Sequence, residues 1–137
     1  MISYMNDQKS FLQKLNQNTN LVQGRFLDFL SNITNALKEK KLVEFLWFNM
    51  PENTDIIYIG TLVDIYASDS ILSKKQPFLI FELNVNGESI LIQSPPINEN
   101  TIECNDNNLN KYYLLDDLMH KYSNRKLDPR FTITIKK

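Results

Sequence analysis

The order of hydrophobic and polar residues divides the chain into a helical N-terminal part and a β-rich remainder. Over 21–41, hydrophobic residues recur at spacings of three and four, which places them on one side of a helix. This stripe consists of Val22, Phe26, Phe29, Leu30, Ile33 and Leu37. A shorter helix followed by an Asn-rich turn (NQNTN, 16–20) is predicted within 1–20, with Asn6 or Asp7 as the N-terminal cap of the helix.

The segment 42–94 predicts a meander of strands joined by turns. Its first part, LVEFLWFNM (42–50), is rich in β-branched and aromatic residues and favours a strand, although it could also extend the preceding helix. The stretch IIYIGTLVDIYA (56–67) favours a second strand. Two further strands flank Asn86-Gly87, a pair that tolerates the two positive φ angles of a tight hairpin turn.

The last third of the chain predicts a loop over 95–108, a helix over 109–122 and a closing strand over 131–136. The helix is favoured by apolar residues three or four positions apart, namely Leu109, Tyr112, Leu115, Met119 and Tyr122. Consecutive strands followed by helices are typical of an α+β domain. We therefore expect residues 1–137 to form one such domain. It would have N-terminal helices, a mainly antiparallel sheet of four to five strands, one later helix and a C-terminal strand.

Bulk properties restrict the compartment and the class of function. The chain has 137 residues, 42% of them hydrophobic, and a net charge of −1, which argues against a general nucleic-acid binder. No apolar run approaches the length of a membrane span, and the N-terminus lacks the pattern of a signal peptide. Cys104 is the single cysteine, so an intrachain disulfide and a multi-cysteine zinc site are excluded. We expect a cytoplasmic protein without a membrane partner or a cofactor.

Charge is distributed unevenly along the chain. The net charge is +3 over 1–41, −5 over 42–73, +2 over 74–81, −6 over 82–117 and +5 over 118–137. The middle of the chain is therefore acidic, while both ends are basic. Such segregation bears on partners and association rather than on the fold.

The segment DNNLNKYYLLDD (106–117) has the outline of a calcium-binding loop, because oxygen-bearing side chains stand at its first, third, fifth and twelfth places. Two of its residues contradict this interpretation. Lys111 occupies the sixth place, where the loop needs glycine, and Leu114 occupies the ninth, a ligand place. A capped amphipathic helix accounts for the same residues, and we expect no metal site here.

Asp64 and Glu82 offer the best catalytic alternative, since they fall in neighbouring predicted strands. Many metal-dependent nucleases hold Mg²⁺ with an aspartate and a following Glu-x-Lys on adjacent strands. Here Asn84 stands where the lysine would be. The pattern predicts, at most, a degenerate Asp…Glu-x-Asn site of a metal-dependent nuclease or phosphodiesterase.

Other catalytic patterns are not indicated. His120 is the single histidine, and no nucleophile motif accompanies it. The chain has three glycines and neither of the common phosphate-binding loops. The leading expectation is therefore a protein that is not an enzyme.

The acidic middle and its aromatic residues favour a contact surface for a protein partner that is itself basic. Lysine outnumbers arginine twelve to three, which is typical of AT-rich bacterial genomes and their mobile elements. An immunity protein or an inhibitor encoded by a mobile element would fit this profile. The predicted contact residues are Glu44, Trp47, Glu52, Asp55, Asp64, Glu82, Glu88, Tyr113, Asp116 and Asp117. The alternatives are the nuclease and a structural homodimer.

Overall fold

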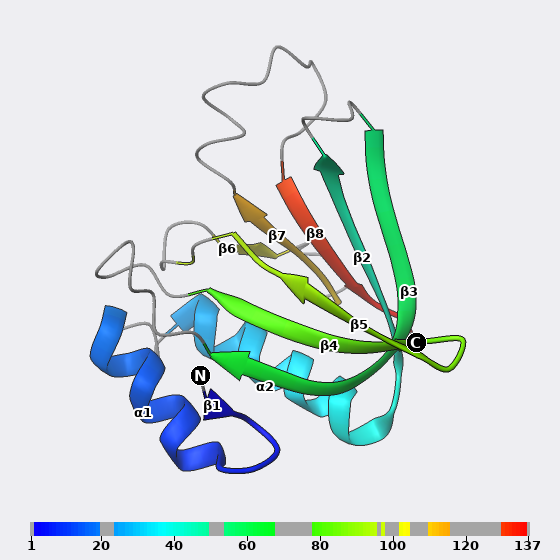
Figure 1. Ribbon diagram of the computed structural model, residues 1–137. Coiled ribbons are helices and arrows are strands. Elements are labelled where there is room, and N and C mark those ends of the chain that lie inside the picture. The colour runs from blue at the N-terminus through cyan, green and yellow to red at the C-terminus, as the bar shows by residue number, and fades with distance from the viewer. Residues whose placement is uncertain are drawn as a thin grey trace.

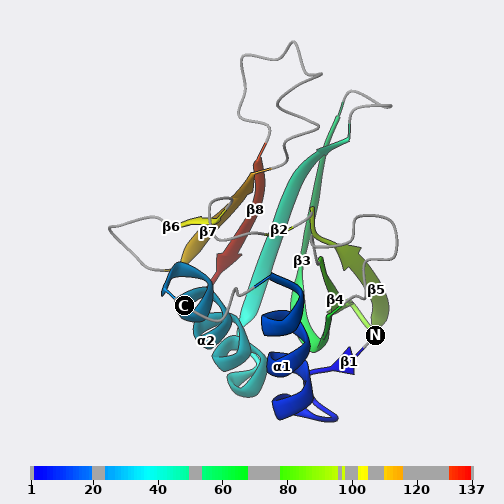
Figure 2. The same ribbon diagram turned by 90° about the vertical axis from the view of Figure 1, so that its left-hand side faces the viewer.

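The computed structural model describes residues 2–19, 24–49, 54–67, 78–95, 97, 102–104, 110–115 and 130–136. These residues form an α+β structure in which two helices lie against one face of an antiparallel sheet (Figures 1 and 2). The elements in chain order are β1 (Ile2–Ser3), α1 (Gln8–Thr19), α2 (Gly24–Glu39), β2 (Leu42–Asn49), β3 (Thr54–Ala67), β4 (Leu79–Val85), β5 (Glu88–Gln93), β6 (Ile102–Cys104), β7 (Lys111–Leu115) and β8 (Arg130–Ile135).

The sheet consists of two antiparallel meanders joined side by side. Within the described residues it has eight strands, of which seven follow the order β5-β4-β3-β2-β8-β7-β6. The first meander runs from β2 to β5 and the second from β6 to β8, and the two meet where β8 pairs with β2. β1 pairs with the end of β3. The C-terminal strand therefore lies inside the sheet, between β2 and β7.

Local hydrogen bonds set the ends of both helices. The Asp7 carboxylate accepts bonds from the backbone N–H and the hydroxyl of Ser10, so Asp7 is the N-cap of α1, one of the two predicted residues. The backbone bond from Ser10 lowers the pKa of Asp7 below its ordinary value. At the end of α2, Lys40 has a φ of 55°, and the Lys41 N–H bonds to the Ala36 carbonyl. This Schellman-type ending turns the chain directly into β2.

The core lies between the helices and the sheet face toward them, which we call the inner face. The opposite face is the outer face. From Phe26 to Leu37 the predicted apolar stripe of α2 is buried, while Val22 lies outside the described residues. Phe29 meets the ring of Tyr112 on β7 edge-on at 5.0 Å. The Asn32 amide donates a hydrogen bond to the Tyr112 hydroxyl. On the sheet, residues that pair directly across strands share a face, so Val43 and Phe45 lie inward with their neighbours.

β3 is the longest strand and bends in its middle. Its first half pairs with β2, and its second half pairs with β4 and β1 (Figure 1). The register shifts between Leu62 and Asp64, as a β-bulge does, and bulges bend the strand that carries them. Gly60 lies next to this bend, where an added Cβ would sit 2.9 Å from the Asn84 carbonyl carbon and still closer to its oxygen. Only glycine allows the β4 backbone to come this near.

Most of the predicted strands are confirmed. The segment predicted to favour a strand over 42–50 forms β2, and β4 and β5 are joined at Asn86-Gly87, where φ is 53° and 89°. Positive φ at both central residues is the requirement of the tight turn that the pair predicts. The closing strand is β8, which begins one residue before the predicted 131.

The predicted helix over 109–122 is wrong in its described part, because Lys111–Leu115 forms β7. In a run this short, the spacing of apolar residues fits both a helix and an alternating strand. Pairing with β8 makes the run a strand, and the alternation buries Tyr112 and Leu114. The predicted loop over 95–108 contains β6. Together with β1, these two strands make the predicted count of four to five too low. At the N-terminus, α1 continues to Thr19, through most of the predicted Asn-rich turn.

Replacing Gly60 with alanine should destabilise the protein, since the added methyl group would overlap with the β4 backbone at Asn84. We expect a loss of about 3 kcal/mol in the free energy of unfolding, measured by urea denaturation. Thr54→Ala, at the exposed start of the same strand, is the control and should change stability by less than about 0.5 kcal/mol. Equal denaturation midpoints for Gly60→Ala and the unmodified protein would contradict this account of the bend.

Candidate functional site

The two carboxylates of the predicted nuclease site do come together. Asp64 on β3 and Glu82 on β4 are direct partners in the antiparallel register, so both side chains leave the sheet on its outer face. The surroundings of the two carboxylates differ, because Asp64 is buried with 8% of its surface exposed and Glu82 is half-buried. Their chemistry therefore depends on which groups each already binds.

Asp64 accepts three hydrogen bonds. Its donors are the Ser3 hydroxyl, the Met5 backbone N–H at 3.1 Å and the Ile65 backbone N–H at 2.7 Å. Two of these donors belong to the N-terminal segment, which pairs with β3 at this point. A buried carboxylate is tolerated when hydrogen bonds replace its water, and here those bonds attach the N-terminus to the sheet. These contacts connect Asp64 to the N-terminal segment and to its own strand.

Glu82 is engaged by neighbours on the same face. The Tyr66 hydroxyl donates to one Glu82 oxygen at 2.7 Å, and the Ser89 hydroxyl lies 3.4 Å from the other. The hydrogen bond to Glu82, with burial and the charges of Glu82 and Asp64 adding to it, raises the pKa of Tyr66 to about 12. The proton of Tyr66 is therefore held more tightly than that of an ordinary tyrosine, which makes the tyrosine a poor base near neutral pH.

The side chain of Asn84, the third member of the predicted set, takes part in the hairpin turn between β4 and β5. Its side-chain oxygen accepts the Gly87 N–H at 2.9 Å and so secures the turn between β4 and β5. Among the described residues, no three His, Cys, Asp or Glu side chains come close enough together to hold a metal ion. In the calcium-like segment, Lys111–Leu115 is an extended strand, and a calcium loop turns sharply at the place that Lys111 holds.

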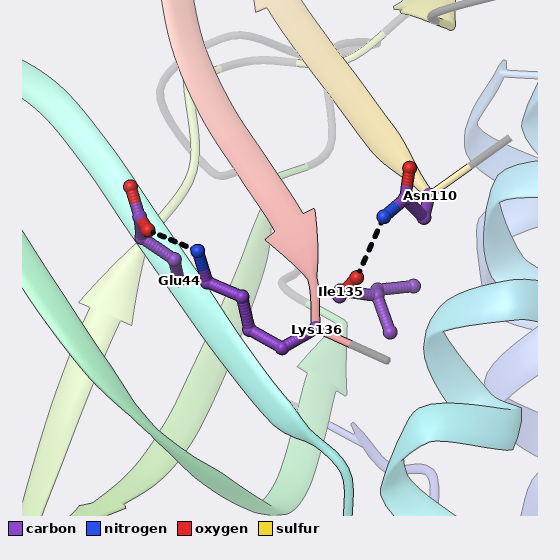
Figure 3. A network of polar contacts seen from close by, with 4 residues as sticks. All are labelled: Glu44, Asn110, Ile135 and Lys136. Carbon is purple, nitrogen blue, oxygen red and sulfur yellow. Dashed lines mark hydrogen bonds and ion pairs between the residues drawn. The ribbon is translucent and has the colours of Figure 1, made fainter. Parts of the chain in front are cut away.

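Glu44 lies at the centre of the outer face and is paired with a basic residue. The Lys136 ammonium is 2.9 Å from the Glu44 carboxylate, with both side chains partly exposed (Figure 3). On the other side of β8, the Asn110 amide donates to the Ile135 carbonyl at 2.9 Å. The end of β8 is thus held between β2 and the residue before β7. The charge of Glu44 is balanced within the chain.

Aliphatic side chains lie around this ion pair. Thr61, Ile59 and Ile57 on β3 are the direct partners of Leu42, Glu44 and Leu46 on β2, which puts all six on the outer face. The exposed fractions are 51% for Leu42, 45% for Ile59 and 56% for Ile57, while Leu46 is half-buried. We call Leu42, Leu46, Ile57 and Ile59 the aliphatic patch. Both helices lie on the opposite face of the sheet (Figure 2).

The other predicted contact residues are scattered. Trp47 lies on the inner face, where its ring stacks on Phe131 at 5.5 Å. Tyr113 is on the outer face of β7, with the Lys111 ammonium 5.6 Å from its ring centre. Asp55 is exposed on the outer face of β3, and Glu88 is exposed at the start of β5. Glu52, Asp116, Asp117 and His120 lie outside the described residues, as does the side chain of Cys104.

The aliphatic patch was not among the predicted contact residues, although the sequence carries a signal for it. The run Ile56-Ile57-Tyr58-Ile59 is apolar at four consecutive positions, whereas a strand with one wet face alternates. A continuous apolar run indicates a strand covered on both faces. Here the inner face meets the core and the outer face is open to solvent at Ile57 and Ile59.

The chain matches no protein-family model, no curated protein and no solved structure. In the described part of the chain, neither helix is long and apolar enough to cross a membrane. Any functional conclusion therefore rests on the contacts and surfaces of the chain itself.

Asp64→Ala should destabilise the fold, because the Ser3 hydroxyl and two backbone N–H groups would lose their acceptor. We expect a loss of about 2–4 kcal/mol in urea denaturation, with faster hydrogen exchange at the Met5 amide. Glu88→Ala removes an exposed carboxylate and is the matched control, with little effect expected. Unchanged stability of Asp64→Ala, together with Mg²⁺ stabilising only the unmodified protein, would favour the metal site instead.

Tyr66 should titrate at about pH 12 rather than near 10. Because its folded pKa is raised, Tyr66 contributes stability that is complete below about pH 10 and is lost as the pH rises through 12. The difference in phenolate absorbance between the unmodified protein and Tyr66→Phe isolates this group. Glu82→Gln should move the transition back toward 10, since it removes the charged acceptor. A Tyr66 transition near 10 in the unmodified protein would contradict the assignment.

Proposed function

We propose that this chain is a non-enzymatic protein-binding protein whose contact surface is the outer face of β2 and β3. The observation that carries the proposal is the aliphatic patch. In it Ile57 and Ile59 are neighbours on β3 and Leu42 lies diagonally from Ile59 on β2, each with about half of its side chain in water. Contiguous apolar surface on a sheet face is unfavourable in water and is typical of interaction sites.

The neighbours of the patch support a protein contact. Glu44 lies between Leu42 and Leu46 and pairs with Lys136 on the β8 side of the patch. Thr134 continues the same face toward β7 and Tyr113, whereas Thr132 is buried. An apolar centre with a polar rim that includes a tyrosine is the usual composition of a protein interface. Because strand backbones are fixed by the sheet, the patch would bind with little loss of conformational freedom.

The acidic residues give weaker support than the aliphatic ones. Glu44 is paired with Lys136, Asp64 is buried and Glu82 accepts two hydrogen bonds, whereas Glu88 is exposed. A basic partner, such as the target of an immunity protein or of a mobile-element inhibitor, would meet Asp55 beside the patch. The three hydrogen bonds that Asp64 accepts are the reason we base no catalytic function on it.

The double substitution Ile57→Lys and Ile59→Lys should abolish partner binding without unfolding the chain, because both side chains are exposed. Tagged forms of the unmodified protein and this variant would be cross-linked in cells of the source organism and compared. Leu27→Lys is the matched control, since Leu27 is 42% exposed on α2, on the other side of the sheet. Cross-links retained by Leu27→Lys and lost from the double variant support the proposal. Identical cross-links from all three forms count against it.

A further inference from the structure

We propose that the partner of the aliphatic patch is a second copy of this chain, bound face to face about a two-fold axis. This inference rests on the proposed function, since it names the occupant of the same surface. In a two-fold interface one patch meets itself, so the patch must be complementary to its own copy. The charge, the shape and the size of the outer face bear on this requirement.

The charges of the patch are self-complementary. The acid and base that lie among its residues, Glu44 and Lys136, are 2.9 Å apart in one chain, so this pair carries no net charge. When two copies meet, each carboxylate and each ammonium can pair within its own chain or with the other chain. The main cost of closing a polar interface is to bury a charge without a partner. Here both charges of the pair keep a partner when the two copies meet. A strongly basic partner would instead have to displace Lys136 from Glu44.

The form of the surface also suits a copy of itself. Sheets packed face to face keep their strands within about 30° of each other, because each sheet has the same hand and degree of twist. Two copies of the same sheet have the same twist, so their faces can pack in this way. The apolar run Ile56-Ile57-Tyr58-Ile59 would then be covered on both faces, by the core on one side and by the second sheet on the other.

The size of the surface predicts a reversible dimer. From Asp55 to Thr61, the outer face of β3, β2, β8 and β7 measures roughly 20 Å along the strands and 19 Å across them. That footprint is roughly 380 Å² on each copy, which is below the roughly 500 Å² per partner of specific stable interfaces, so the association would be weak and transient. We therefore expect monomers and dimers to exchange rapidly and their proportions to depend on concentration.

Sedimentation velocity over a series of concentrations up to about 1 mM tests the association directly. The unmodified protein should shift from monomer to dimer. Ile57→Lys with Ile59→Lys should weaken dimerisation by about a hundredfold, because it places four lysines against one another across the axis. Leu27→Lys should dimerise like the unmodified protein. A monomer at every concentration, or equal dimerisation of the double variant, overturns the inference.

Mixing two charge variants tests whether the same face is used by both copies. Glu44→Lys gives a face with two lysines, and Lys136→Glu gives a face with two glutamates. Each alone should dimerise about tenfold more weakly than the unmodified protein, and an equimolar mixture should form the heterodimer. Circular dichroism confirms that both variants are folded, and the charge-exchanged Glu44→Lys with Lys136→Glu should dimerise normally. A mixture that associates no better than its components overturns the face-to-face arrangement.

Failure of this inference is distinguishable from failure of the proposed function. If the purified chain stays monomeric while cross-links in cells to a different protein depend on Ile57 and Ile59, the second copy is excluded and the contact surface stands. If the chain is monomeric and the cross-links do not depend on the patch, both are excluded.

Discussion

The bend of β3 at Gly60 is the constraint on which the remaining architecture depends. One strand of 14 residues pairs with β2, β4 and β1, and it can do so only by changing direction between its two halves. The change requires a residue without a side chain where the β4 backbone crosses, and an irregular register directly after it. The direction of β4 and β5, and the place where the N-terminus joins the sheet, follow from this bend.

The bulge also determines what Asp64 does. It brings an acidic residue beside the N-terminal segment, where hydrogen bonds from Ser3 and Met5 replace its solvent. The same register sets Glu82 opposite Asp64, so two carboxylates that resemble a metal-binding pair in sequence become neighbours in space. Asp64 accepts hydrogen bonds from the N-terminal segment, and Glu82 accepts one from the Tyr66 hydroxyl.

The two faces of the central strands differ in what covers them. Both helices lie against the inner face, where Phe45, Phe81 and Phe131 pack together. The outer face of β2 and β3 remains aliphatic around the Glu44–Lys136 pair. Hydrophobic residues on both sides of a strand are favourable only when both sides are covered. Self-association through this face would complete the second layer that a two-sided apolar strand requires.

Local signals determined much of the chain. The apolar stripe of α2, the Asp7 cap and the Asn86-Gly87 turn depend on residues close in sequence, and each was predictable. Even the aliphatic patch was signalled by four consecutive apolar residues in β3, although the prediction favoured the acidic residues around it.

Local pattern could not decide between helix and strand at Lys111–Leu115, because the apolar spacing in so short a run fits both a helix and a strand. Pairing with β8, which follows it in the chain, decided for a strand. Tertiary structure likewise paired Glu44 with Lys136 and buried Asp64 against Ser3, since contacts between residues far apart in sequence depend on the completed sheet.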